Sequence, residues 1–275
     1  ELLRQEKIEV IGVSRNKGKI IGDIKNYNFV SDIIRQFKPS YIFHLAANST
    51  TNHSAIFDNH EAICSGTLNI LEAARMHCPG AKIFIAGSGL QFNNDGISIN
   101  ENTSFSPSSI YSVARIQAVY ACRYFRDKFK LKVYIGYLFN HDSPLRSERH
   151  VNQKIITAVN RIENGSQEKI SLGNISVKKE FGYAKDIANG IWHLLNQDDF
   201  YEAAIGTGKA YSLLDWLEIC FSMIGKKWQD YVIIDNTFKS EYEILVSDPK
   251  TIFSTGWRPQ FDINDLAKIM KYNKY

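Results

Sequence analysis

Lys132-Val-Tyr-Ile-Gly-Tyr-Leu138 is a short apolar run that follows a helical pattern from Ser109 to Phe129, which itself follows Lys82-Ile-Phe-Ile-Ala86. The two short runs are rich in β-branched and aromatic residues, which is typical of strands covered on both faces. A long helix between two such strands indicates a βαβ unit with parallel strands. This stretch therefore predicts the α/β class.

The same alternation continues on both sides of this stretch. We expect further strands at 8–13, 41–46, 169–172 and 201–205. We expect further helices at 1–7, 27–37, 59–77, 151–164, 186–195, 213–224 and 263–270. The order predicts a doubly wound, Rossmann-like parallel sheet over residues 1–140, to which the chain returns around 178–206, and a smaller lobe over 141–275.

Composition and charge exclude several classes of protein. The chain is 44% hydrophobic and 23% charged with a net charge of +4, which is typical of a globular protein and too mild to indicate nucleic-acid binding. No apolar run is long enough for a membrane-spanning helix, and no signal-peptide pattern is present. The four cysteines are far apart in sequence, so we expect reduced thiols, mostly buried, in a cytoplasmic protein.

Tyr111 and Arg115 are the first candidates for chemistry. They are four residues apart near the start of the long helix, so they share one face. A cation beside a phenol stabilises the phenolate and lets tyrosine act as a base. Just upstream, Gly87-Ser88-Gly89 follows a strand and places a hydroxyl at the carboxyl end of the sheet, where ligands bind in this fold. The alternative is an ordinary surface pair.

Three other segments follow strands. Ser14 to Lys19 carries three cations, and an arginine there accommodates a 2′-phosphate, which favours NADP; a solvated loop is the alternative. His44-Leu-Ala-Ala-Asn48 spans a strand end, and its two alanines allow close approach of a cofactor, or only tight packing. The polar loop Asn140 to His150 suits a phosphorylated ligand or is a surface loop, and its spacing does not favour a metal site.

Taken together, these motifs resemble the extended short-chain dehydrogenase/reductases that act on nucleotide sugars. Within them, the segment Leu138-Phe-Asn-His-Asp-Ser-Pro144, the pair Val151 and Lys154, and the segment Lys178 to Asp186 are similar to the GDP-mannose 4,6-dehydratase family. The resemblance covers about residues 2–268. It implies NADP as cofactor, GDP-mannose as substrate, and a homo-oligomer, either a dimer or a tetramer.

The resemblance also implies roles for individual residues. Tyr111 would take the sugar hydroxyl proton, Arg115 would stand at the place of the family lysine, and Ser88 would bond the sugar oxygen. The residues implied to line NADP are Arg15, Asp23, Ala46, Ala47, Tyr111, Arg115 and Leu138. The residues implied to contact the nucleotide sugar are Asn140, Val151, Lys154, Lys179 and Glu241.

Three departures from the family bear on the reaction. The family's opening strand and glycine-rich turn have no counterpart here, and we expect about 20 residues before Glu1. Arg115 replaces a lysine, which exchanges a compact ammonium for a planar fork. Leu90 stands where the dehydratases have the glutamate that removes the proton beside the ketone. We therefore predict a 4,6-dehydratase, with a nucleotide-sugar epimerase or 4-keto reductase, or an inactive nucleotide-sugar-binding homologue, as alternatives.

Overall fold

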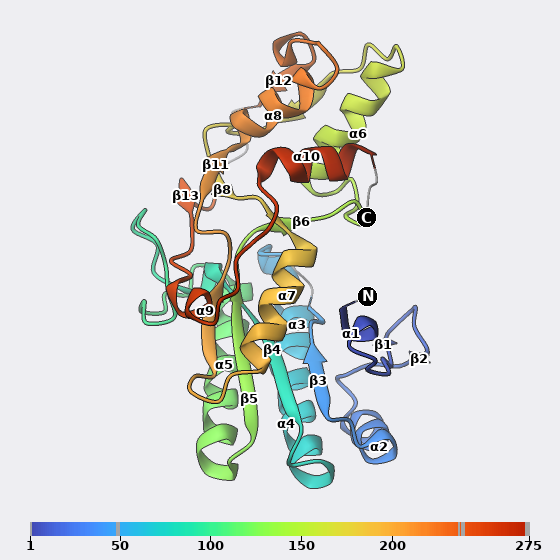
Figure 1. Cartoon of the computed structure of the whole chain (residues 1–275), viewed down its shortest axis with the longest axis vertical. Coiled ribbons are helices and arrows are strands. Elements are labelled where there is room, and N and C mark those ends of the chain that lie inside the picture. Colours follow the sequence, from blue (N-terminus) through green and yellow to red (C-terminus); the bar gives the residue numbers. More distant parts are fainter. Residues whose placement is uncertain (1, 48–49, 236, 238–239, 273–275) are drawn as a thin grey trace. The chain divides into compact units, whose positions relative to one another are not determined.

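The computed structural model describes residues 2–47, 50–235, 237 and 240–272, and the chain divides into two compact units (Figure 1). Unit 1 comprises Glu1–Asn93, Glu101–Tyr137 and Ile191–Ala203. Unit 2 comprises Asn94–Asn100, Leu138–Gly190 and Ala204–Tyr275.

The main sheet has the strand order β10-β5-β4-β3. Its strands are β3 (Tyr41–His44), β4 (Lys82–Ser88), β5 (Lys132–Leu138) and β10 (Glu202–Ile205). β3 and β4 are parallel, with Tyr41 opposite Lys82 and His44 opposite Ile85. From its second residue onward β4 is buried, as its apolar composition predicts. The predicted α/β class with a parallel sheet is confirmed.

Three helices of unit 1 begin or end as their sequences predict. α2 (Tyr27–Phe37) starts at Asn26, whose side chain accepts a hydrogen bond from the Phe29 amide, and stops at Lys38 in the left-handed conformation before Pro39. α4 (Gly66–His77) packs against α2 and against α5 (Ile110–Phe129). α5 begins at the Ser109 cap and also packs on β4, which brings its first turns to that strand.

The helix expected at 59–77 is interrupted. α3 (Ile56–Asn59) is followed by the π-helical segment His60–Ser65, labelled η2, and then by α4. A π turn adds a residue to each helical turn and is often found at functional sites. Here it brings Ile63 and Cys64 into an apolar cluster with the start of α5.

The strand expected at 8–13 is wrong. After α1 (Leu2–Gln5), only β1 (Val13–Ser14) forms a strand, and it pairs in parallel with β2 (Ile20–Ile21). Val10 and Val13 are exposed. A β-branched run needs a neighbouring strand for its backbone groups, and residues 8–12 have none within the described ranges.

Unit 2 has its own core, centred on the fully buried Trp216. The helices α6 (Val151–Glu163), α8 (Leu213–Ser222) and α10 (Ile263–Tyr272) pack against one another around it. β8 (Lys178–Glu180) lies between β11 (Ala210–Ser212) and β13 (Ile244–Leu245). The other elements of unit 2 are β6 (His141–Asp142), β7 (Ile170–Leu172), β9 (Gly182–Tyr183), β12 (Val232–Ile234), α9 (Lys250–Ser254) and the short helix η4 (Trp228–Asp230). The short helices η1 (His53–Ala55) and η3 (Gly89–Gln91) belong to unit 1, and α7 (Ala184–Leu195) begins in unit 2 and ends in unit 1.

The carboxylate of Glu180, the last residue of β8, fastens unit 2 together. It accepts hydrogen bonds from the Ser247 amide at 2.7 Å and hydroxyl at 2.6 Å, from the amide and hydroxyl of Thr207, and from the Gly208 amide at 3.2 Å. Glu180 is fully buried, so these donors replace its lost water. A side chain at Gly206 would collide with this carboxylate.

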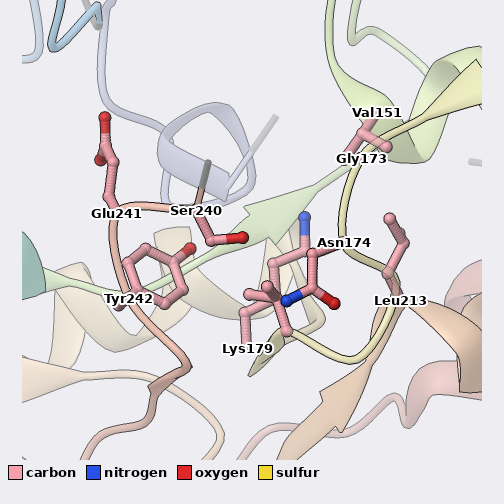
Figure 2. Close-up of a pocket in the computed structure, with 9 residues that line it drawn as sticks. Val151, Gly173, Asn174, Lys179, Leu213, Ser240, Glu241 and Tyr242 are labelled. Atoms are coloured by element: carbon pink, nitrogen blue, oxygen red, sulfur yellow. The ribbon is translucent and has the colours of Figure 1, made fainter. Parts of the chain in front are cut away.

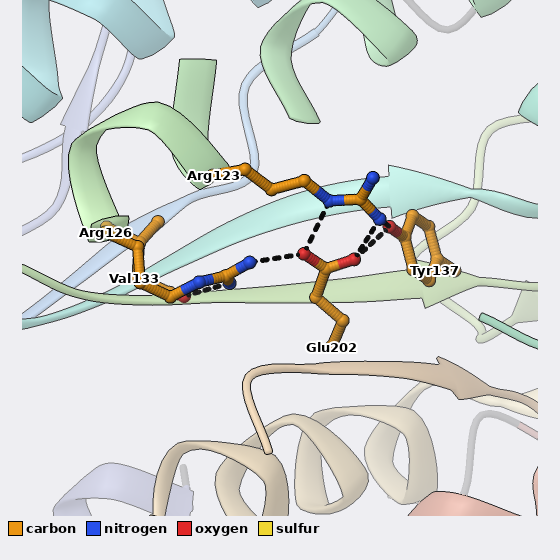
Figure 3. A network of polar contacts seen from close by, with 5 residues as sticks. All are labelled: Arg123, Arg126, Val133, Tyr137 and Glu202. Atoms are coloured by element: carbon orange, nitrogen blue, oxygen red, sulfur yellow. Dashed lines mark hydrogen bonds and ion pairs between the residues drawn. The ribbon is translucent and has the colours of Figure 1, made fainter. Parts of the chain in front are cut away.

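Unit 1 contains a half-buried carboxylate, Glu202, with charged partners (Figure 3). Arg123 and Arg126 each approach it at 2.7 Å, and the Tyr137 hydroxyl donates to it at 2.6 Å. Burial alone would raise its pKa, but these hydrogen bonds outweigh burial and lower the pKa of Glu202 to about 2.

None of the helices in the described ranges combines the length and apolar character needed to cross a membrane.

Candidate active site and nucleotide pocket

Tyr111 and Arg115 form a buried couple on the first turns of α5. Arg115 Nε donates to the Tyr111 hydroxyl at 3.1 Å, and the guanidinium carbon lies 5.1 Å from the centre of the tyrosine ring. The Nη1 atom of Arg115 donates to the Ala86 carbonyl of β4. The side chains are 8% and 5% exposed, so the couple is not a surface pair.

Arg115 is a buried cation without a counter-charge. No carboxylate lies within ion-pair distance of it in the part of the chain that the structure describes. Removing a guanidinium from water is costly unless it is paired, so its positive field is left for the tyrosine oxygen and for a bound group. These residues fit an anionic or hydroxyl-rich cofactor such as NADP.

Ser88 ends β4 and caps the short helix η3. Its hydroxyl accepts a hydrogen bond from the Leu90 amide at 3.2 Å, and its own amide donates to the Gln91 side chain at 2.9 Å. The cap uses only a lone pair of the hydroxyl, so the Ser88 proton stays available for a substrate oxygen. Ser88 is two residues beyond Ala86, which ties it to Arg115 through β4.

Leu90 packs against an apolar cluster around the catalytic candidate Tyr111. The cluster consists of Ile63, Cys64, Tyr111, Ala114 and Ala118, with Ala47 and Leu90 against it. Its only weakly acidic group besides the tyrosine is the Cys64 thiol, which is hydrogen-bonded to Gln117 at 3.0 Å. Burial raises the pKa of this thiol to about 11, so the cluster supplies no anionic base.

His44 is a residue that sequence reasoning treated only as part of a strand end. It is 3% exposed, and burial, together with the charge of Arg115, lowers its pKa to about 4. Its Nε2 atom has no hydrogen-bond partner among the described residues. A neutral imidazole therefore lies close to the Arg115 charge; the motif at this strand end was interpreted through its alanines, and no role was predicted for the histidine.

The other residues implied for the cofactor differ in exposure. Arg15 and Ala46 are exposed, while Ala47 and Leu138 are half-buried. Asp23 accepts a hydrogen bond from the Lys25 amide at 3.0 Å, so its carboxylate is part of a turn.

Unit 2 contains a pocket of about 260 Å³ (Figure 2). It is lined by Val151, Gly173, Asn174, Val177, Lys179, Leu213, Ser240, Glu241 and Tyr242. Three of the five residues implied for the nucleotide sugar are among these. The other two are not: Lys154 donates to the Ser171 carbonyl at 2.7 Å, and the Asn140 side chain is hydrogen-bonded to Tyr242.

Lys179 is the charged residue best placed for an anion. Its ammonium lies 5.2 Å from the centre of the Phe181 ring, with no hydrogen-bond or ion-pair partner in the described ranges. The pKa of Lys179 is lowered. Burial is the largest cause, the charge of Arg146 adds to it, and the charge of Asp142 opposes it. A lysine desolvated in this way and left unpaired beside a cavity favours an anionic ligand.

The polar loop after β5 is held by Asp142. Its carboxylate accepts from Arg146 Nε at 2.8 Å and from Asn152 Nδ2 at 2.7 Å, and Arg146 Nη2 donates to the His141 carbonyl. The loop is thus fastened to the first turn of α6, beside Val151. No group of three or more His, Cys, Asp or Glu side chains suited to a metal is found in the described part of the chain.

Comparison with known proteins places this geometry in a family. The family model described as GDP-mannose 4,6 dehydratase matches residues 4–270. Similar curated proteins include GDP-mannose 4,6 dehydratase 1 of Arabidopsis thaliana, 30% identical over 90% of this chain and 72% of that protein, and GDP-mannose 4,6 dehydratase of Homo sapiens, 32% identical over 90% and 74%.

Solved structures support the fold. RMD from Pseudomonas aeruginosa complexed with NADPH has a TM-score of 0.84 at 17% identity, covering 91% of this chain and 86% of that one. MoeE5 in complex with UDP-glucuronic acid and NAD has a TM-score of 0.86 at 18% identity, covering 98% and 92%. The matches to the family model and to the curated relatives carry the assignment: the chain belongs to the GDP-mannose 4,6-dehydratase family.

Proposed function

We propose that this protein is an NADP-dependent nucleotide-sugar 4,6-dehydratase that acts on GDP-mannose. The observation that carries the proposal is the buried hydrogen bond from Arg115 Nε to the Tyr111 hydroxyl, which gives one tyrosine a permanent cationic partner. Membership in the family and the curated relatives support the substrate. The domains then divide the work: unit 1 carries the oxidoreduction and unit 2 binds the nucleotide sugar.

The residues of unit 1 would handle the proton at the sugar C4 hydroxyl. Tyr111 takes that proton as a general base, and Arg115 stabilises the phenolate that would do so. Ser88 donates its hydroxyl proton to the sugar oxygen, which orients the C4–H bond. NADP, when bound, supplies the hydride acceptor.

Arg15 would give the preference for NADP over NAD. It lies exposed in the loop after β1, with Lys17 and Lys19 as further cations. A planar guanidinium can donate two hydrogen bonds to a 2′-phosphate at the same time. Asp23, Ala46, Ala47 and Leu138 are assigned to the same cofactor by the resemblance.

Leu90 favours a second candidate, a 4-keto reductase. Elimination of water across C5–C6 needs a base at C5, and the cluster around Tyr111 offers an aliphatic side chain and a protonated thiol. A reductase needs only Tyr111, Ser88 and the cofactor, and so does an epimerase of the same family. In the reductase Tyr111 would give to the C4 oxygen the proton that it takes in the dehydratase, and the other residues keep their proposed roles.

The deciding experiment offers two substrate pairs to the purified protein. GDP-mannose with NADP should yield a 4-keto-6-deoxy product, detected by mass spectrometry as the loss of one water. A GDP-4-keto-6-deoxy sugar with NADPH tests the reductase. Product only in the second assay replaces dehydratase by reductase, and no product in either with retained nucleotide-sugar binding supports an inactive binding protein.

The proposal extends to assembly and location. α4 and α5 pack side by side and expose Leu68, Met76, Tyr120 and Tyr124, an apolar surface suited to a second copy, so we propose a homo-oligomer, a dimer or a tetramer. Light scattering measures its mass. A cytoplasmic location is supported by the four cysteines, all of which are free thiols.

A further inference from the structure

Tyr242 lines the pocket of unit 2 and belongs to no motif of the sequence. Its side chain lies on the pocket wall next to Ser240, while the Glu241 carboxylate points away from Lys179 and Asn174 (Figure 2). Burial, and then the charge of Glu241, raise the pKa of Tyr242 to about 12. The phenol therefore keeps its proton at neutral pH and is a hydrogen-bond donor there.

Asn140 fixes the direction of that donor. Its side chain lies within reach of the Tyr242 hydroxyl and lowers the pKa of the phenol, as a hydrogen-bond donor to that oxygen does. The Asn140 Oδ1 atom is buried and has no partner among the described residues, which agrees with this assignment. Because the hydroxyl oxygen accepts from Asn140, its own proton is free for another acceptor.

The pocket contains a second group that calls for an acceptor with negative charge. Lys179 is a half-buried ammonium without a protein partner within the described ranges, and it lines the same cavity as Tyr242. An ammonium and a phenol donor on one cavity wall match the oxygens of a phosphate group, which accept several hydrogen bonds at once.

We propose that Tyr242 is a ligand-binding residue that donates its hydroxyl proton to the diphosphate of the nucleotide sugar, and that Asn140 is a positioning residue acting through Tyr242. This inference rests on the proposed function for the identity of the ligand. It assigns Asn140, which the resemblance placed against the sugar, to the support of Tyr242.

The first test is Tyr242→Phe, which removes the hydroxyl and keeps the ring. Calorimetric titration should give Kd values for GDP-mannose and GDP that rise about tenfold, the worth of one hydrogen bond to a charged group. In steady state KM should rise and kcat should stay. The matched control is Tyr211→Phe, a half-buried tyrosine of β11 in the same unit and outside the pocket, which should leave Kd unchanged.

The second test is a double-mutant cycle with Asn140→Ala. The single substitution should weaken GDP binding severalfold, and in the Tyr242→Phe background it should have no further effect. Multiplying effects would mean that Asn140 binds the ligand by itself, which overturns its positioning role. An unchanged Kd in Tyr242→Phe with an unchanged unfolding midpoint overturns the role of Tyr242.

Binding separates this inference from the proposed activity. Wild-type protein that binds GDP-mannose without turning it over fails the proposed function, and the Kd values of the Tyr242→Phe protein still decide the present inference. Wild-type protein that binds UDP-glucose instead changes the base, and the same titrations apply. Wild-type protein that binds neither GDP nor UDP overturns the diphosphate assignment of the pocket.

Discussion

Helix α5 carries arginines in two different situations. On its first turns, Arg115 has a phenol and a backbone carbonyl as partners and no carboxylate within the described residues. Two and three turns later, Arg123 and Arg126 both contact Glu202, which also accepts from Tyr137 (Figure 3). The helix thus has one end with an uncompensated charge and one end with a neutralised cluster.

The difference separates residues that hold the fold from residues that wait for a ligand. A buried pair whose hydrogen bonds are all made has no further capacity for binding, and its removal costs stability. A buried cation that lacks an anion is expensive for the fold, and such groups gather at functional sites. The four predictions below test this division, beginning with the largest effect.

Tyr111→Phe should have the largest effect on turnover. If Tyr111 is the general base, kcat should fall by roughly 10² to 10⁴, the usual worth of one positioned proton-transfer group. The ring keeps its packing, but Arg115 Nε loses its buried acceptor, so stability should fall by about 1 to 3 kcal/mol. Steady-state assays and urea unfolding measure both. The control is Tyr124→Phe, which changes an exposed tyrosine on the same helix. Equal activities of the two variants would show that Tyr111 is not the general base and that the first turns of α5 have no catalytic role.

Glu202→Gln should cost stability and leave kcat intact. Two arginines would lose their anion. Removing one partner of a fully buried pair costs about 3 to 5 kcal/mol, and we expect about 2 kcal/mol here because the Arg123 side chain is 35% exposed. Urea unfolding gives the change. Glu148→Gln, at an exposed pair with Arg161, is the matched control and should change stability by less than about 0.5 kcal/mol. An unchanged urea midpoint for Glu202→Gln would show that the ion pairs and hydrogen bonds of Glu202 do not stabilise the fold.

Arg115→Lys should lower kcat about tenfold. The guanidinium donates to the Tyr111 hydroxyl and to the Ala86 carbonyl from two different nitrogens, whereas a lysine ammonium is a single point donor. Arg126→Lys should leave kcat unchanged and reduce stability instead. Activity equal to or above wild type in Arg115→Lys would mean that the charge alone matters.

Acid should weaken the paired end of α5 first. The pKa of Glu202 is lowered to about 2 in the folded protein, so its contribution to stability is present above its unfolded pKa, near 4.5, and is lost as the pH falls toward 2. Between pH 5 and pH 3.5 the free energy of unfolding should fall by about 1 kcal/mol from this group. Glu202→Gln should flatten that part of the profile measured by urea unfolding, and parallel profiles would contradict the assignment.

The elements of the fold followed from local pattern to a large extent. α2 and β5 have the predicted bounds, because apolar spacing and the stop at Lys38-Pro39 act within the segment itself. The short strands of unit 2, such as β8 and β13, were not predicted. They are two or three residues long and exist through pairing with distant segments, which leaves no periodic signal.

The residues of the candidate site were also only partly predictable from local sequence patterns. The four-residue spacing of Tyr111 and Arg115 indicated that they share a face, and the structure joins them by a hydrogen bond. Their roles in catalysis stay predictions. Tyr242 has no such signal, and the motif that contains His44 does not indicate the contact of its ring with the Arg115 charge, because Asn140 and Arg115 are far away in sequence from these residues. Nothing in a local pattern shows which polar atom is left without a partner.

The Glu180 carboxylate has a consequence for the speed of folding. It joins β8 to Thr207 and to Ser247, which are 27 and 67 residues further along the chain. Closing such long loops costs conformational entropy before the hydrogen bonds of Glu180 can stabilise the chain. We therefore expect these bonds to form late in folding, after the helices of unit 2 have packed. Weakening the hydrogen bonds of Glu180 should therefore raise the unfolding rate of unit 2 and leave its folding rate almost unchanged.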